Sequence, residues 1–118
     1  MRDIISDEAR IRHISDAITN IENFTADIGI SDFLSSNLIK SATVRQMEII
    51  GEGVNHLSEE LKEKYTEINW IEIVSFRNIA IHEYFVIDYA VIWNIIENYI
   101  PELKITIEKI IKNEFNKQ

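Results

Sequence analysis

The stretch RNIAIHEYF carries four side chains whose chemistry suits cleavage of a phosphodiester. These are Arg77, Asn78, His82 and Tyr84, set in a largely apolar segment. An arginine is always charged and its planar fork of donors matches phosphate oxygens, while a histidine exchanges a proton near neutral pH. In RNA, the 2′-hydroxyl can serve as the nucleophile if a base takes its proton and a cation stabilises the charge that builds on phosphorus. Such a reaction requires no metal, no cofactor and no protein nucleophile.

The spacing of Arg77 and His82 indicates that one molecule supplies only half of such a site. On a straight helix the two side chains point about 140° apart, because each residue turns the helix by about 100°. Two copies related by a two-fold axis can place both sets in one cleft. Asn78 can orient the phosphate or the imidazole, and Tyr84 can hydrogen-bond the substrate. The alternative is structural, with Arg77 paired to a carboxylate and the other side chains completing the core.

Other polar residues point less clearly to a reaction centre. The sequence has no Walker loop and no GxGxxG motif, and no histidine follows a Glu or Asp by three residues, as di-iron bundles require. Glu52 and His56 are four residues apart and can share a helix face, which is more often a surface contact than part of a metal site. His13 has charged neighbours, and we expect it to be solvated.

The composition predicts one globular domain over residues 1–118. Hydrophobic residues make up 46% and charged residues 27%, with one proline and no cysteine, so we expect a fully folded chain without disulfides. No apolar leader or membrane-length apolar run is present, which favours a cytoplasmic protein without a membrane span. The net charge of −8 argues against a broad basic face for nucleic acid, so RNA chemistry must occupy a small local site.

Apolar residues recur at three- and four-residue steps, which predicts an all-α, up-down bundle of four to five helices. The first helix is expected at about residues 4–25, and a second begins near Ser31 and Asp32. A long helix follows at about residues 37–65, and another leads from Trp70 into the RNIAIHEYF stretch. Asp88 can cap a last helix, which Pro101 stops or kinks so that PELKITIEKIIKN continues at an angle.

Two glycines interrupt the long predicted helix, at Gly51 and Gly53. Each costs a helix interior roughly 0.5 to 1 kcal/mol relative to alanine. We therefore expect a neighbouring helix or a ligand to approach the backbone closely at these positions.

The residues from Arg77 to Tyr84 resemble the R-x4-6-H-x-Y signature of the HEPN superfamily. Flanking blocks agree: IIGEGVNHLSEELKEKY resembles the long IGEA-type helix of that family, EINW the loop before the motif helix, and DYAVIW with IPELK the closing helix. The likeness covers nearly the whole chain and is closest to the HepT-like toxins of two-gene modules that pair a HEPN protein with a minimal nucleotidyltransferase (MNT). Gly53 departs from the pattern, because the family more often has alanine there.

This resemblance implies a helical homodimer in which Arg77 and His82 of both protomers form a metal-independent ribonuclease cleft, with Asn78, Tyr84 and Glu52 in supporting roles. It also implies an MNT-type nucleotidyltransferase antitoxin that transfers AMP from ATP to Tyr84. An added phosphate beside the cleft would repel an RNA phosphate. The alternative is a non-catalytic module that docks the nucleotidyltransferase and can hold a nucleotide.

Overall fold

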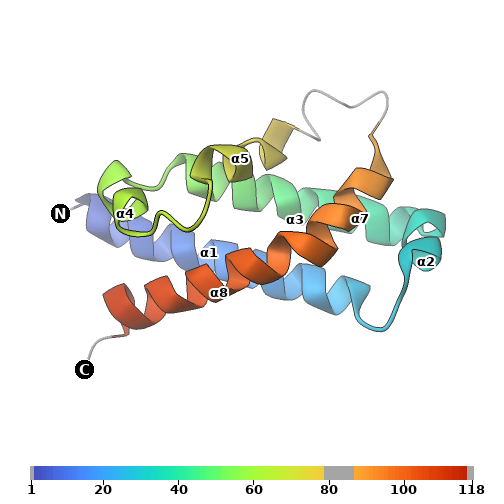
Figure 1. The fold of residues 1–118 in the computed structure, drawn as a ribbon, viewed down its shortest axis with the longest axis horizontal. Helices are drawn as coiled ribbons and strands as arrows, with labels where there is room; N and C mark the ends of the chain where they lie inside the picture. Colours follow the sequence, from blue (N-terminus) through green and yellow to red (C-terminus); the bar gives the residue numbers. More distant parts are fainter. Residues whose placement is uncertain (1, 79–86, 117–118) are drawn as a thin grey trace.

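Two long helices, α1 (Arg2–Thr25) and α3 (Asn37–Asn55), lie side by side at the centre of the molecule (Figure 1). The computed structural model describes residues 2–78 and 87–116, and all regular elements within these ranges are helical. The others are α2 (Ile30–Ser35), α4 (Glu59–Lys64), α5 (Trp70–Val74), α7 (Tyr89–Asn98), α8 (Ile100–Ile110) and a π-helical turn, η1 (Ile111–Phe115). The predicted all-α bundle is confirmed.

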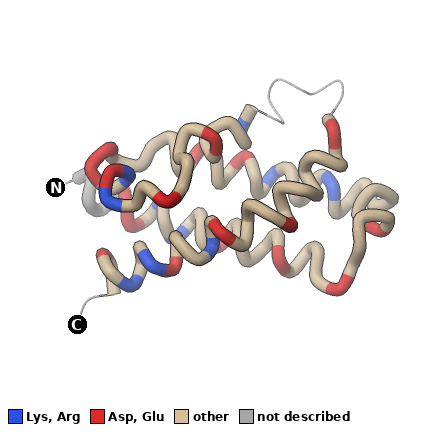
Figure 2. Tube along the Cα trace, viewed as in Figure 1, with Lys and Arg blue, Asp and Glu red and all other residues tan. Residues whose placement is uncertain are grey.

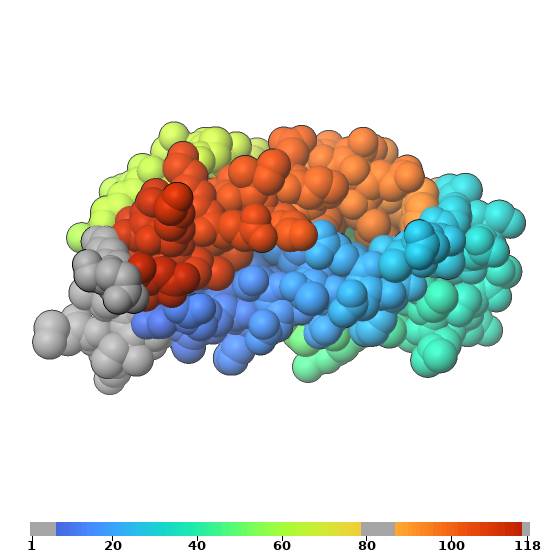
Figure 3. All heavy atoms as spheres, turned by 90° about the horizontal axis from the view of Figure 1, so that it is seen from below, coloured from blue at the N-terminus to red at the C-terminus, as the bar shows by residue number. Residues whose placement is uncertain are grey.

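The apolar stripes of the sequence become the core. Side chains on α1, α3 and α8 are at most 1% exposed at Ile11, Ile14, Ile18, Ile21, Met47, Ile50, Val54, Leu103, Ile107 and Ile110. Helix α8 covers α1, and the two lie side by side along the face shown in Figure 3. An ion pair at their surface joins Lys104 Nζ to Glu22 at 3.0 Å, and the hydrogen bond to Glu22 raises the pKa of Lys104.

The first and last predicted helices are confirmed, but the start of the second differs from the prediction. Helix α2 begins at Ile30 with Gly29 as its N-cap, and the Asp32 carboxylate accepts a hydrogen bond from the Gly29 N–H at 3.3 Å. Ser31 therefore lies within the first turn. The acidic side chain satisfies an exposed backbone donor at the positive end of the helix, so the cap forms at Gly29, two residues before the expected Ser31.

The single long helix expected over residues 37–65 is wrong, because the chain breaks into α3 and α4. Ser58 caps α4 by accepting a hydrogen bond from the Leu61 N–H at 3.2 Å. The buried carboxylate of Asp7 accepts from the Ser58 N–H at 2.9 Å and from its hydroxyl at 2.6 Å. This contact from α1 stabilises the break, because the Ser58 backbone donor is satisfied outside any helix.

The connections after α4 follow the sequence signals. The Trp70 indole N–H donates to the Tyr65 carbonyl at 2.8 Å, and the Asn69 side chain caps α5 by accepting from the Glu72 N–H at 3.1 Å. Asp88 caps α7 through the N–H groups of Ala90 and Val91. Pro101 lies in the first turn of α8, where a missing N–H costs nothing. None of the described helices is long and apolar enough to cross a membrane.

Both glycines of α3 lie where another backbone or side chain approaches closely, as predicted. A Cβ added to Gly51 would lie 2.6 Å from the Arg77 backbone nitrogen and 3.0 Å from the Val74 carbonyl oxygen. A Cβ added to Gly53 would lie 3.0 Å from Cγ1 of Ile14 on α1. Helix α3 is therefore held between α1 and the segment after α5, and each glycine makes room for one of them.

Substituting Gly51 tests the backbone contact. We expect Gly51→Ala to lower the free energy of unfolding by about 1–3 kcal/mol, because the added methyl group meets backbone atoms that cannot rotate away. This loss outweighs the roughly 1 kcal/mol that alanine gains in helix propensity. Gly53→Ala is the matched control on the same helix, since its methyl group meets a side chain that can adjust. Urea unfolding of the three proteins measures the difference, and equal stability of the two variants would contradict the close contact.

Candidate functional site

Arg77 and Asn78 lie in a short helical segment, residues 76–78, that follows the end of α5. Phe76 is buried and anchors this segment in the core. The next residue, Arg77, is held against Gly51 of α3 by its backbone and keeps 31% of its side chain exposed. Asn78 is exposed, and its N–H donates to the Ser75 carbonyl at 2.9 Å. The fold thus presents the arginine at the surface of α3.

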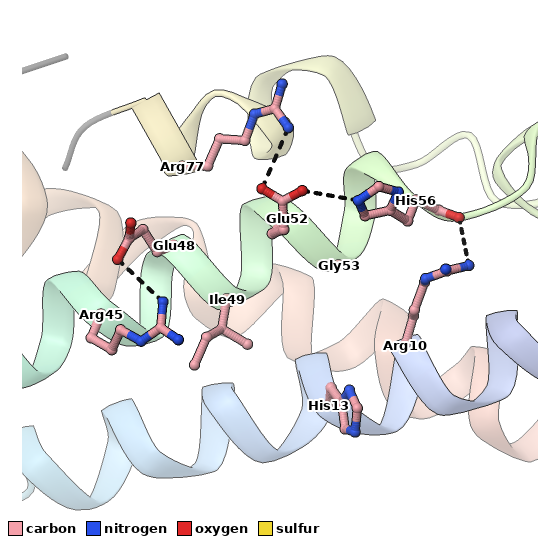
Figure 4. Close-up of a pocket in the computed structure, with 9 residues that line it drawn as sticks. All are labelled: Arg10, His13, Arg45, Glu48, Ile49, Glu52, Gly53, His56 and Arg77. Atoms are coloured by element: carbon pink, nitrogen blue, oxygen red, sulfur yellow. Dashed lines mark hydrogen bonds and ion pairs between the residues drawn. The ribbon is translucent and has the colours of Figure 1, made fainter. Parts of the chain in front are cut away.

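A surface groove of about 300 Å³ opens beside Arg77 (Figure 4). Helix α3 forms its length, α1 forms the opposite side, and Arg77 lies above α3 in the view. The floor between the two long helices includes Ile49 and Gly53. The groove is lined by Arg10, His13, Arg45, Glu48, Ile49, Glu52, Gly53, His56 and Arg77.

This groove gathers positive charge in a protein that is otherwise acidic. Three arginines and two histidines line it, against two glutamates, so its lining carries a net positive charge while the whole chain carries −8. Figure 2 shows acidic positions distributed along the helices, with basic positions interspersed among them. A concave surface with a net positive charge attracts an anion. This distribution of charge agrees with the expectation that RNA chemistry occupies a small local site.

Glu52 links the arginine of the motif to a histidine one turn further along α3. Its carboxylate lies 3.5 Å from the Arg77 guanidinium and 2.9 Å from Nε2 of His56. Arg10 of α1 completes this row by donating to the His56 carbonyl at 3.0 Å. The row joins α1, α3 and the segment after α5 at the protein surface (Figure 4).

The interactions of Arg77 leave its guanidinium able to bind a phosphate. The contact with Glu52 is long, and both side chains are partly exposed, at 31% and 51%. An exposed ion pair contributes about 0–1 kcal/mol. A guanidinium carries five N–H donors, and within the described ranges only one carboxylate partner is recorded for Arg77. An incoming phosphate can therefore bind without breaking a strong contact.

The structure brings together two of the residues implied by the resemblance and places a third beside them. Glu52 contacts Arg77 directly, and Asn78 follows in the same turn. His82 and Tyr84 lie outside the described residues. In the described ranges no group of three or more His, Asp or Glu side chains could hold a metal ion.

Four basic lining residues were not identified as part of this site from the sequence: Arg10, His13, Arg45 and His56. Arg45 and His56 lie at helical spacing from Glu52, whereas Arg10 and His13 on α1 are distant from it in sequence. The signal that could have found them is Gly53, because a close approach between α1 and α3 at that glycine aligns their polar faces. His56 does pair with Glu52, as the surface-contact interpretation predicted.

Comparison with known proteins identifies the family. The family model "Ribonuclease HepT-like" matches residues 14–110. The chain is 35% identical to "Putative RNase MJ1380" of Methanocaldococcus jannaschii, over 86% of this chain and 93% of that protein. It is 37% identical to "Probable ribonuclease HepT" of Thermococcus cleftensis, over 86% of this chain and 93% of that protein. No solved structure matches the chain significantly. The chain belongs to the ribonuclease HepT-like family.

Proposed function

We propose that this protein is a metal-independent ribonuclease with Arg77 and His82 as its catalytic residues. One observation carries the proposal: Arg77, the first residue of the R-x4-H-x-Y motif, lines the groove that gathers positive charge in an acidic protein. Membership of the ribonuclease HepT-like family and the ribonuclease names of the relatives support it.

The proposed reaction is an internal attack within the RNA strand. The 2′-oxygen forms a bond to phosphorus, the bond from phosphorus to the 5′-oxygen breaks, and the products are a 2′,3′-cyclic phosphate and a 5′-hydroxyl. His82 takes the proton from the 2′-hydroxyl, and an acid returns a proton to the leaving oxygen. Arg77 stabilises the charge that builds on the phosphate, and Asn78 orients it. Glu52 has a supporting role, since its carboxylate contacts the Arg77 guanidinium.

The ion pair between Arg77 and Glu52 also favours a second function. If this pair serves only to attach the segment after α5 to α3, the protein is a non-catalytic module that docks a nucleotidyltransferase. The two functions differ in what loss of the guanidinium does. Removing an arginine with only a structural role lowers the stability of the protein. Removing a catalytic arginine lowers the rate of RNA cleavage.

RNA cleavage by purified protein separates these functions. We expect the protein to cleave single-stranded or transfer RNA in the presence of EDTA, and His82→Ala to reduce the rate by about 10²- to 10⁴-fold, as loss of a positioned acid or base does. Arg77→Gln should have an effect of similar size without loss of the folded state by circular dichroism. Arg12→Gln is the matched control, because Arg12 contacts Glu8 and Asn116 away from the groove. Full activity of His82→Ala, or strict dependence on a metal, would exclude the mechanism.

The proposed enzyme is a homodimer, because one chain cannot aim Arg77 and His82 at one point on a straight helix. Exposed apolar side chains beside the motif support this assembly. Ile71 on α5 is 85% exposed, and Val91 and Tyr99 at α7 are 51% and 42% exposed. A surface hollow joins Val91 and Tyr99 to Ser75 and Phe76, immediately before Arg77. Burial of this surface by a second copy would bring the two Arg77 residues near the same interface.

Charge placed on this surface tests the dimer. We expect the protein to elute as a dimer in size-exclusion chromatography with light scattering, and Val91→Asp to shift it toward the monomer, because an unpaired carboxylate at an apolar interface is costly. RNA cleavage should fall together with the dimer fraction. Ile105→Asp is the control, since Ile105 is 66% exposed on α8. A dimer that survives Val91→Asp unchanged would place the interface elsewhere.

The proposed biological role is that of a toxin controlled by a nucleotidyltransferase antitoxin that modifies Tyr84. AMP transfer joins the tyrosine oxygen to the α-phosphorus of ATP and releases pyrophosphate. The attached phosphodiester would add negative charge and bulk at Tyr84, seven residues along the chain from the arginine that lines the positive groove. That charge competes with the RNA phosphate for the same arginine, which explains how modification would inactivate the enzyme.

Intact mass spectrometry tests the modification. After incubation with ATP and a nucleotidyltransferase encoded next to this protein, we expect a mass increase of one or more AMP units and loss of RNA cleavage. Tyr84→Phe should prevent the mass increase, because it lacks the accepting hydroxyl, and Tyr99→Phe, at an exposed tyrosine outside the motif, should not. No added mass on the wild-type protein with an active transferase would count against regulation at Tyr84.

A further inference from the structure

The groove extends beyond Arg77, and its far parts carry cations that the proposed reaction does not use. Arg45 and Arg10 lie at opposite ends of the groove, and His13 lies on its α1 side, across from Arg77 (Figure 4). All three line the same surface hollow. Helix α3 and its C-cap contribute the lining residues from Arg45 to His56, a span of about 16 Å at 1.5 Å per residue. One scissile phosphate does not fill this length.

These cations have capacity for a ligand. The Arg45 side chain is 66% exposed, and its recorded partner among the described residues is Glu48, at 3.4 Å. Arg10 uses one donor on the His56 carbonyl, which leaves other guanidinium donors facing the groove region. His13 is exposed and forms no hydrogen bond with the described part of the chain. An imidazole in this state can stack on a base or contact a phosphate.

We propose that Arg10, His13 and Arg45 form a binding subsite for the nucleotides that flank the cleaved bond, so that the substrate is a single-stranded segment of RNA lying along α3. This inference rests on the proposed ribonuclease function. The two arginines bind backbone phosphates on either side of the one at Arg77, and His13 contacts a base or a phosphate between them. Phosphates of one strand repeat about every 3.4 Å along the axis of duplex DNA. They lie further apart in an extended single strand, and a groove of about 16 Å still spans more than one.

The shape and charge of the groove favour a single strand. A duplex needs a wide positive surface that contacts both strands, because double-stranded RNA is recognised across its minor groove by shape and phosphate contacts. Here the positive lining is confined to a hollow of about 300 Å³, on a chain with a net charge of −8. A second strand would add phosphate charge on a protein whose net charge is already negative, with no further groove cations among the described residues to offset it.

Salt-dependent binding of an uncleavable RNA tests the subsite. The probe is a short, fluorescein-labelled, single-stranded oligonucleotide with 2′-O-methyl groups throughout, which removes the nucleophile. We expect Arg10→Gln/Arg45→Gln to weaken binding roughly tenfold and to reduce the slope of log affinity against log salt by about 1.4, since each single-strand phosphate contact contributes about 0.7. Arg10→Lys/Arg45→Lys should keep the slope. A duplex of the same sequence should bind more weakly than the single strand.

A charge-matched control separates this subsite from general electrostatics. Arg12→Gln/Lys112→Gln removes the same charge from two positions that do not line the groove, and its slope should match that of the wild type. Equal changes in both double variants, or no change in either, would overturn the subsite. If Arg10→Gln/Arg45→Gln fails to fold, Arg45→Gln alone should reduce the slope by about 0.7, and an unchanged slope there overturns it equally.

Cleavage of unmodified RNA by the wild-type protein distinguishes failure of the subsite from failure of the proposed function. If the wild type cleaves RNA while Arg10→Gln/Arg45→Gln binds the probe normally, the subsite is wrong and the ribonuclease stands. If the wild type neither cleaves RNA nor binds the probe, the ribonuclease function fails and the subsite fails with it. Tighter binding of the duplex would reject the single-stranded substrate.

Discussion

The close packing of α3 against its two neighbours is the constraint on which the candidate site depends. Gly51 lets the backbone at Val74 and Arg77 approach α3, and Gly53 lets Ile14 of α1 approach it from another side. A side chain at Gly51 would push the Arg77 backbone away, and the guanidinium would move with it. Helix α3 thus has two residues of low helix propensity. Their lack of a side chain lets α1 and the segment after α5 meet along one groove.

Electrostatics then makes this groove different from the rest of the surface. The chain is strongly acidic, which suppresses non-specific binding of long nucleic acid because phosphates are repelled over most of the molecule. Three arginines converge in one hollow, so attraction for a phosphate is local. An enzyme that must act on RNA without being sequestered by it benefits from this arrangement.

Glu52 has a central place in the groove, because it contacts both Arg77 and His56. Its carboxylate holds the guanidinium near α3 and offsets part of its charge. The contact is long and exposed, so a phosphate can replace it at little cost. The two interpretations of the motif arginine are therefore compatible, since the guanidinium can attach the segment after α5 to α3 and still be available to a phosphate.

The sequence by itself determined the helical class, most helix positions and the close approaches at Gly51 and Gly53, because three-and-four apolar spacing and helix-interior glycines are local signals. It also supplied the motif from Arg77 to Tyr84 and the family resemblance that the comparisons confirmed. It did not predict the break between α3 and α4, which depends on the Asp7 carboxylate reaching Ser58 across 51 residues. Nor did it assemble Arg10, His13, Arg45 and His56 beside Arg77. Only tertiary packing decided this, because a groove between two helices depends on how their faces align in space, and spacing within each helix does not specify that alignment.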